Sequence, residues 1–172
     1  MKIAYTMAPG RGDTDLLLCR VAQRLASDGF RCCGTVQTNT DCADGPCDMD
    51  VMVLPDGPVF RISQSLGRHA RGCRLDPAAL ESAVAEVSAH LDTQPDVLII
   101  NKFGKHEADG RGFRSVIADG LSRDIPVLVG VNTLNSDAFI TFAGPEAVKL
   151  DHDDDVLINW VAANTKRALQ PA

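Results

Sequence analysis

The chain has 172 residues, 45% of them hydrophobic, and its 17 basic and 23 acidic side chains give a net charge of −6. This size and hydrophobicity suffice for one substantial core, so we expect residues 1–172 to form a single domain. The acidic excess argues against nucleic acid or an anionic membrane surface as the main partner. Residues 1–10 resemble a first strand rather than a secretory signal, and no stretch approaches the roughly 20 apolar residues of a membrane span, so we expect a cytoplasmic protein.

Helix and strand signals alternate through the first third of the chain. Leu18, Val21 and Leu25 recur at helical spacing, and Gly29 supplies a stop. The alternation of polar and apolar residues in 48–54 is typical of a strand with one wet face. In chain order we predict a strand at 2–6, a helix at 14–28, a strand at 30–36, a polar loop at 38–46, and a hairpin of strands at 48–54 and 60–62.

The rest of the chain has the signals of a parallel sheet covered by helices. Asp76 before Pro77 predicts a helix start, because aspartate accepts the free N–H groups of a first turn and proline has no N–H to lose. The continuous apolar run 97–100 is typical of a strand buried on both faces. The alternation predicts an α/β fold of three layers with a mainly parallel sheet, to which 48–62 adds a small β-hairpin. We predict helices at 77–91, 113–121, 137–142 and 154–169, and strands at 97–100, 126–131 and 147–150.

Residues 5–14, YTMAPGRGDT, run from an apolar strand through a Pro/Gly loop into a helix, as a phosphate-binding P-loop does. The motif GxxxxGK[ST] needs a lysine where this chain has Asp13 and a first glycine where it has Met7, whereas Thr14 stands in its expected place. The backbone N–H groups of 10–14 at a helix N-terminus still predict an attraction for anions.

A second segment, 96–107 (DVLIINKFGKHE), has the form of the strand that ends in metal-binding and water-activating carboxylates, but it ends in Asn101 and Lys102. Asp13 would place a negative charge near bound phosphate, at a cost of several kcal/mol for an effective dielectric of roughly 20. The sequence therefore argues against ordinary Mg²⁺-dependent ATP hydrolysis. Because both segments face one crevice in a P-loop fold, we expect Asp13 and Lys102 to form a reversed charge pair.

The stretch 101–107 keeps Gly104, Lys105 and Glu107 of a motif in the small P-loop nucleoside triphosphatases, the cancer-related nucleoside triphosphatase family, which the chain resembles. It resembles the bacterial domain of unknown function 2478 family more closely, in the phrases RISQSLG, GCRLD and NKFGKHEADGRGFR. The resemblance implies a P-loop-NTPase-like fold. Members of the second family are often encoded beside molybdate-uptake genes, so the resemblance also implies a molybdenum connection, although it supplies no established activity.

The first functional prediction is a protein that binds a small anionic ligand, a nucleotide or an oxyanion, at the carboxyl ends of the strands. We expect Arg111 and Arg114 at the mouth of the same site. The sequence leaves open whether a protein partner or a second copy of the chain is also bound. The residues predicted to bind the ligand are Gly10, Arg11, Gly12, Asp13, Thr14, Lys102 and Lys105.

An enzyme is the first alternative. In a divergent nucleoside triphosphatase, Lys102 or Lys105 would replace the missing lysine and Glu107 the missing carboxylate. His106 and Glu107 together would then be the candidate general base or metal pair, so these two residues are the catalytic candidates.

A metal-handling or interaction module in molybdenum metabolism is the second alternative. The six cysteines form no paired CxxC knuckles, which argues against a structural zinc site. Three of them lie in predicted helix or strand and are expected to be small buried hydrophobes, namely Cys19, Cys32 and Cys33. The candidates for metal binding are the loop residues Cys42, Cys47 and Cys73, together with His106.

Overall fold

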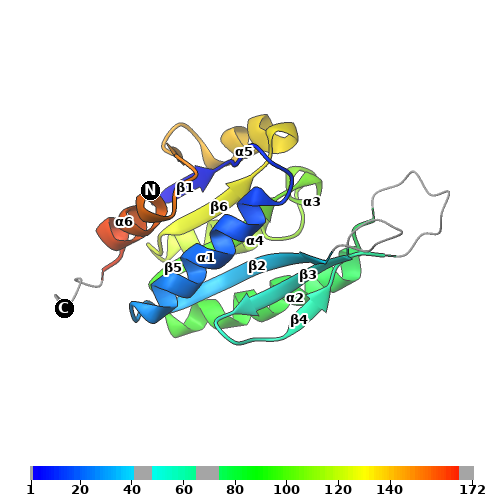
Figure 1. The fold of residues 1–172 in the computed structure, drawn as a ribbon, viewed down its shortest axis with the longest axis horizontal. Coiled ribbons are helices and arrows are strands. Elements are labelled where there is room, and N and C mark those ends of the chain that lie inside the picture. The colour runs from blue at the N-terminus through cyan, green and yellow to red at the C-terminus, as the bar shows by residue number, and fades with distance from the viewer. Residues whose placement is uncertain (1, 41–47, 65–73, 167–172) are drawn as a thin grey trace.

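The computed structural model describes residues 2–40, 48–64 and 74–166, and within them it has an α/β fold on one seven-stranded sheet (Figure 1). The strands are β1 (Ile3–Thr6), β2 (Cys32–Thr40), β3 (Asp48–Leu54), β4 (Val59–Arg61), β5 (Val97–Phe103), β6 (Val127–Val131) and β7 (Val148–Leu150). Their order is β4-β3-β2-β5-β6-β1-β7. The strands from β2 to β7 in this order pair in parallel, whereas β3 and β4 extend the sheet as an antiparallel hairpin. The predicted mainly parallel sheet with a hairpin insertion is confirmed.

Helices cover both faces of this sheet. They are α1 (Asp13–Ser27), α2 (Pro77–His90), α3 (Lys105–Ala108), α4 (Arg114–Ser122), α5 (Ser136–Ala143) and α6 (Asp154–Asn164). Figure 1 shows α1 crossing the face of the sheet nearest the viewer. α1 and α6 enclose one apolar cluster with the sheet, around Leu18 and Leu157. α2, α4 and α5 enclose the other, around Val87 and Phe139, so the molecule has the predicted three layers.

The start of α2 lies where the sequence predicts it. The Asp76 carboxylate accepts hydrogen bonds from the N–H groups of Ala78 at 2.9 Å and Ala79 at 3.2 Å, and Pro77 is the first helical residue. The local signals of aspartate and proline are therefore sufficient to position this helix.

Three predicted boundaries differ from the structure by three residues or more. Residues 38–40, predicted as loop, continue β2 because they pair with 48–50 of β3. β5 runs on to Phe103, which is fully buried and pairs with Val131 after a register shift. α6 ends at Asn164, because the next residue, Thr165, has extended backbone angles.

The two edges of the sheet are short. β4 and β7 contain three residues each. On β4, Arg61 forms ion pairs with Asp48 and Asp50 of β3, both at 3.0 Å, so the hairpin edge carries charge. Among the described residues, no helix has the length and apolar character needed to cross a membrane.

Candidate functional site

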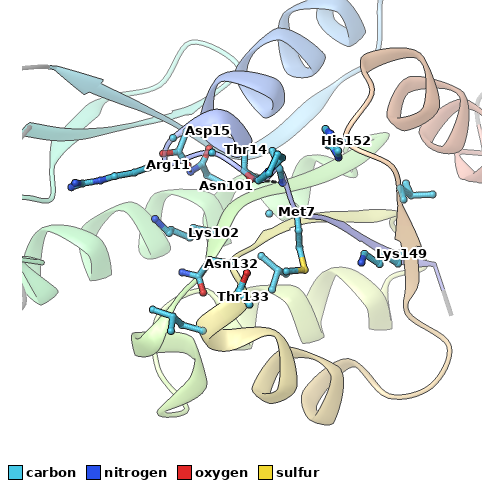
Figure 2. A pocket seen from close by; sticks show the side chains of 18 of the residues that line it. Met7, Arg11, Thr14, Asp15, Asn101, Lys102, Asn132, Thr133, Lys149 and His152 are labelled. Atoms are coloured by element: carbon cyan, nitrogen blue, oxygen red, sulfur yellow. Dashed lines mark hydrogen bonds between the residues drawn. The ribbon is translucent and has the colours of Figure 1, made fainter.

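A cavity of about 790 Å³ lies at the carboxyl ends of β1, β5 and β6 (Figure 2). Its walls come from the first loop (residues 7–12), the start of α1, and the ends of three strands with the residues that follow them. These are Asn101 and Lys102 near the end of β5, 130–134 at the end of β6 and beyond it, and 149–152 at the end of β7 and beyond it. Because β6 lies between β1 and β5, the cavity joins segments whose strands are not neighbours. Ligands of open α/β sheets commonly bind at this edge, so the cavity is the candidate site.

The first loop closes on itself through Thr14, whose hydroxyl accepts a hydrogen bond from the N–H of Ala8 at 3.0 Å. Gly12 is the N-cap of α1 and has φ of 84°, a left-handed conformation that glycine adopts without strain. Among the described residues, no side chain hydrogen-bonds to cap this 15-residue helix. The partial positive charge of its N-terminus therefore lies at the cavity without a side-chain acceptor.

Asp13 does not line the cavity. Its carboxylate folds back against Gly10, so closely that a Cβ at position 10 would collide with it. Both Asp13 and Lys102 are described, and no ion pair joins them. The predicted reversed charge pair is therefore not formed, because one side chain turns to the backbone of its own loop while the other lines the cavity.

Basic side chains line the cavity on two sides. In Figure 2, Arg11 and Lys102 lie on one side, and Lys149 and His152 on the other. All four are exposed, and none of them takes part in an ion pair with a described residue. Arg11 and Lys102 are among the residues predicted from the sequence, whereas Lys149 and His152 are not. The available signal was their position, because Lys149 lies within β7, the last strand, and His152 lies just after it.

A network of amides surrounds Asp15 in the cavity wall. This carboxylate, only 5% exposed, accepts hydrogen bonds from the side chains of Asn101 at 2.8 Å, Asn39 at 2.7 Å and Gln37 at 3.4 Å. The Asn101 side-chain oxygen accepts from the Gln37 backbone N–H at 3.0 Å. Asn101 therefore positions Asp15 and β2 from the strand position where a metal-binding carboxylate was expected. Sequence reasoning missed Asp15, although it lies three residues before Leu18 on the apolar side of the predicted helix.

Glu107 is a buried carboxylate that binds its own loop. Its two oxygens accept hydrogen bonds from the N–H groups of Gly104 at 2.9 Å and Phe113 at 3.2 Å. Burial raises the pKa of the Glu107 carboxyl, and these hydrogen bonds oppose the rise. His106 points elsewhere and contacts Glu81 of α2 at 2.9 Å. These two catalytic candidates share no hydrogen bond, and neither lines the cavity, although both line the smaller pocket beside it.

The other basic residues predicted near the site, Lys105, Arg111 and Arg114, lie outside the cavity. Lys105 lines a smaller pocket beside the cavity, and Arg111 lines neither of these two hollows. The Arg114 guanidinium lies 4.4 Å from the centre of the Phe142 ring, a cation–π arrangement on the α4–α5 side of the fold. These three residues do not surround the mouth of the cavity.

A model of the family described as "Protein of unknown function (DUF2478)" matches residues 3–160. The chain belongs to the DUF2478 family. Over 160 residues the DUF2478 protein is 34% identical to the molybdenum import ATP-binding protein ModC 2 of Bradyrhizobium diazoefficiens. The match covers 92% of this chain but 18% of the relative, so the chain spans less than a fifth of the relative's length.

The fold of the DUF2478 protein is also similar to a solved structure. The solution structure of a human cancer-related nucleoside triphosphatase matches it with a TM-score of 0.68 at 16% sequence identity, over 96% of this chain and all of that one. At this identity the likeness shows the fold alone. It confirms the P-loop-NTPase-like fold that the sequence predicts.

The described cysteines of the DUF2478 protein are free thiols inside the fold. Burial raises the pKa of Cys32 to about 12 and that of Cys33 to about 11. Both thiols are therefore uncharged at neutral pH and pack like small hydrophobic side chains. Cys19 is half-buried. Among the residues that the structure describes, no three His, Cys, Asp or Glu side chains group as a metal site. The predicted metal-binding residues Cys42, Cys47 and Cys73 lie outside the described residues.

Proposed function

We propose that this protein binds a small anionic ligand, a nucleotide or an oxyanion, in the cavity at the first loop. The observation that carries the proposal is the N-terminus of α1, which no described side chain caps, at a cavity that Arg11 and Lys102 also line. An anion there gains the helix dipole and charge-assisted hydrogen bonds together. The name of the ModC 2 relative, a molybdenum import ATP-binding protein, adds support, because ATP is an anion.

We further propose that binding occurs without ordinary Mg²⁺-dependent hydrolysis. P-loop hydrolases use a lysine on the phosphates and a strand carboxylate on the metal, whereas this chain has Asp13 and Asn101 in those places. Asp15 lines the cavity, but both of its oxygens already accept amide hydrogen bonds. A divergent triphosphatase that depends on Glu107 ranks second, because both oxygens of that carboxylate bind its own loop. Mg²⁺-dependent phosphate release that Glu107→Gln abolishes would favour this second function.

Thermal unfolding with candidate anions tests the binding proposal. The protein is heated with ATP, ADP, molybdate, sulfate or phosphate, each with and without Mg²⁺, since a ligand at 100 times its Kd adds about 2.7 kcal/mol of stability. We expect at least one anion to raise Tm, and Lys102→Ala or Arg11→Ala to weaken its binding about tenfold. Arg111→Ala is the matched control, because Arg111 is equally exposed and basic but lies outside the cavity. No shift with any of these anions would contradict the proposal.

A further inference from the structure

A second pocket, of about 270 Å³, adjoins the cavity on the side of the β3–β4 hairpin and α2. The two hollows share three lining residues, Asn101, Lys102 and Asn132. These residues lie near the carboxyl ends of β5 and β6, so one ligand can extend past them from the first hollow into the second.

The walls of this pocket are mainly apolar. Four of the apolar lining side chains are buried, and the partly buried Met49 and Leu75 complete the apolar surface. The four come from β3, from the residue after β4, from α2 and from the residue before α4, namely Val51, Ile62, Leu80 and Phe113. A hydrocarbon group or an aromatic ring would therefore bind favourably in this pocket, because it would bury apolar surface there.

Most polar groups in the pocket already have partners. His106 contacts Glu81, and Glu107 accepts the N–H groups of its own loop. The Asn132 side-chain oxygen accepts hydrogen bonds from the backbone and side-chain N–H groups of Asn135 at 3.0 and 2.9 Å. A strongly polar ligand group would have to break these bonds, so an uncharged group of low polarity fits better.

Lys102 and Lys105 supply positive charge at the rim, and neither forms an ion pair with a described residue. The volume of about 270 Å³ lies just below the ~300 Å³ at which pockets for complete small-molecule ligands begin. Size and charge together indicate a compartment for one part of a ligand, next to a site for its anionic group.

We propose that this pocket receives an uncharged ring of an organic anion whose charged group lies beside Lys102. This inference rests on the proposed function and narrows it, because the ligand becomes an organic phosphate or a similar organic anion rather than a free inorganic oxyanion. The ring contributes by covering Val51, Leu80 and Phe113, and the anion contributes through Lys102 and the first loop.

Two anions that differ by one ring test the inference. Calorimetric titration of the full chain compares inorganic phosphate with 1-naphthyl phosphate, and we expect the naphthyl ester to bind at least about tenfold more tightly. Met49→Trp places a ring into the pocket from β3 and should remove this advantage while leaving phosphate binding unchanged. Met52→Trp is the matched control, because Met52 is also half-buried on β3 but packs on the opposite face of the sheet. Lys102→Ala should weaken the binding of both anions.

The possible outcomes separate the inference from the proposed function. Equal affinities of the two anions in the natural protein, or equal loss in both tryptophan variants, would overturn the ring pocket and leave the anion site intact. Binding of neither anion would overturn both proposals. Leu75→Asn, which removes apolar surface from a half-buried position, gives the same test if Met49→Trp does not fold. The far-ultraviolet circular dichroism of each variant checks its fold.

Discussion

The first loop and the loop of residues 104–113 both lie at the carboxyl edge of the sheet, yet they use their backbone N–H groups differently. In the second loop, Glu107 accepts the N–H groups of Gly104 and Phe113, so the chain satisfies its own donors. In the first loop no side chain from the described part of the chain caps α1, and Asp13 lies against Gly10 instead. A glycine-rich loop is a candidate anion site when no carboxylate of the same loop accepts its backbone N–H groups. The glycine content of the loop does not by itself show whether this is so.

The largest effect should come from breaking the self-satisfied loop. Glu107→Ala leaves the buried N–H of Phe113 and the partly buried N–H of Gly104 without their acceptor. A buried group left unpaired costs about 1–3 kcal/mol, so we expect a loss of roughly 3 kcal/mol in the free energy of unfolding. Urea denaturation measures it. Glu86→Ala, on the exposed side of α2, is the control and should change stability by no more than about 0.5 kcal/mol. A loss below about 1 kcal/mol for Glu107→Ala would show that water replaces the carboxylate.

A smaller effect is expected at the wall of the open cavity. Asp15→Asn replaces a carboxylate that accepts three amide hydrogen bonds with an amide that must turn N–H groups toward some of the same donors. We expect destabilisation by about 2 kcal/mol in urea. The exposed turn residue Asp56, changed to Asn, serves as the control. Unchanged stability would mean that the amides around Asp15 rearrange freely.

Asp13→Asn tests how the negative charge in the first loop affects anion binding. Removing this charge should strengthen anion binding several-fold, about 1 kcal/mol for an exposed group near the site, with little change in stability. Calorimetric titration gives the affinity, and thermal unfolding gives the stability. Unchanged anion binding would show that the Asp13 charge does not act on the site.

The smallest expected effect is in the pH dependence of stability. Because burial raises the folded-state pKa of Glu107, its protonated form is favoured by folding, and this stabilisation is lost as pH rises through the folded pKa. The natural protein should therefore gain stability relative to Glu107→Gln as pH falls from 7 towards the unfolded glutamate pKa of about 4.3. Urea denaturation at several pH values measures the difference. An opposite slope would mean that the two N–H hydrogen bonds outweigh burial.

Local signals were sufficient for the fold but not for the contacts of the site. β3 covers Asp48–Leu54, the range that alternation predicts, and α2 begins beside Asp76 as its cap predicts. Asp15 was missed because its partners follow it by 22 to 86 residues, a separation that no local pattern reveals. The direction of the Asp13 side chain depends on its rotamer. The expectation that Asp13 and Lys102 face one crevice was therefore not enough to predict that they form a pair.

Contacts between distant segments also explain why local sequence predicted the positions of the basic side chains only in part. Arg114 follows a glycine-rich stretch that predicts solvent exposure, but its guanidinium stacks on Phe142 from a different helix. Lys102 lines the cavity, because a residue near the end of a central parallel strand lies at the carboxyl edge of the sheet.

The short outer strands of the sheet limit unwanted pairing with other strands. In the ModC 2 relative the matching region is 18% of the length, so there it has other parts of the same chain around it. A long, flat outer strand would offer unpaired N–H and C=O groups to any neighbouring strand. β4 and β7 offer three residues each, and Arg61 adds charge to the first. We therefore expect the domain to resist accidental strand exchange with its neighbours during folding.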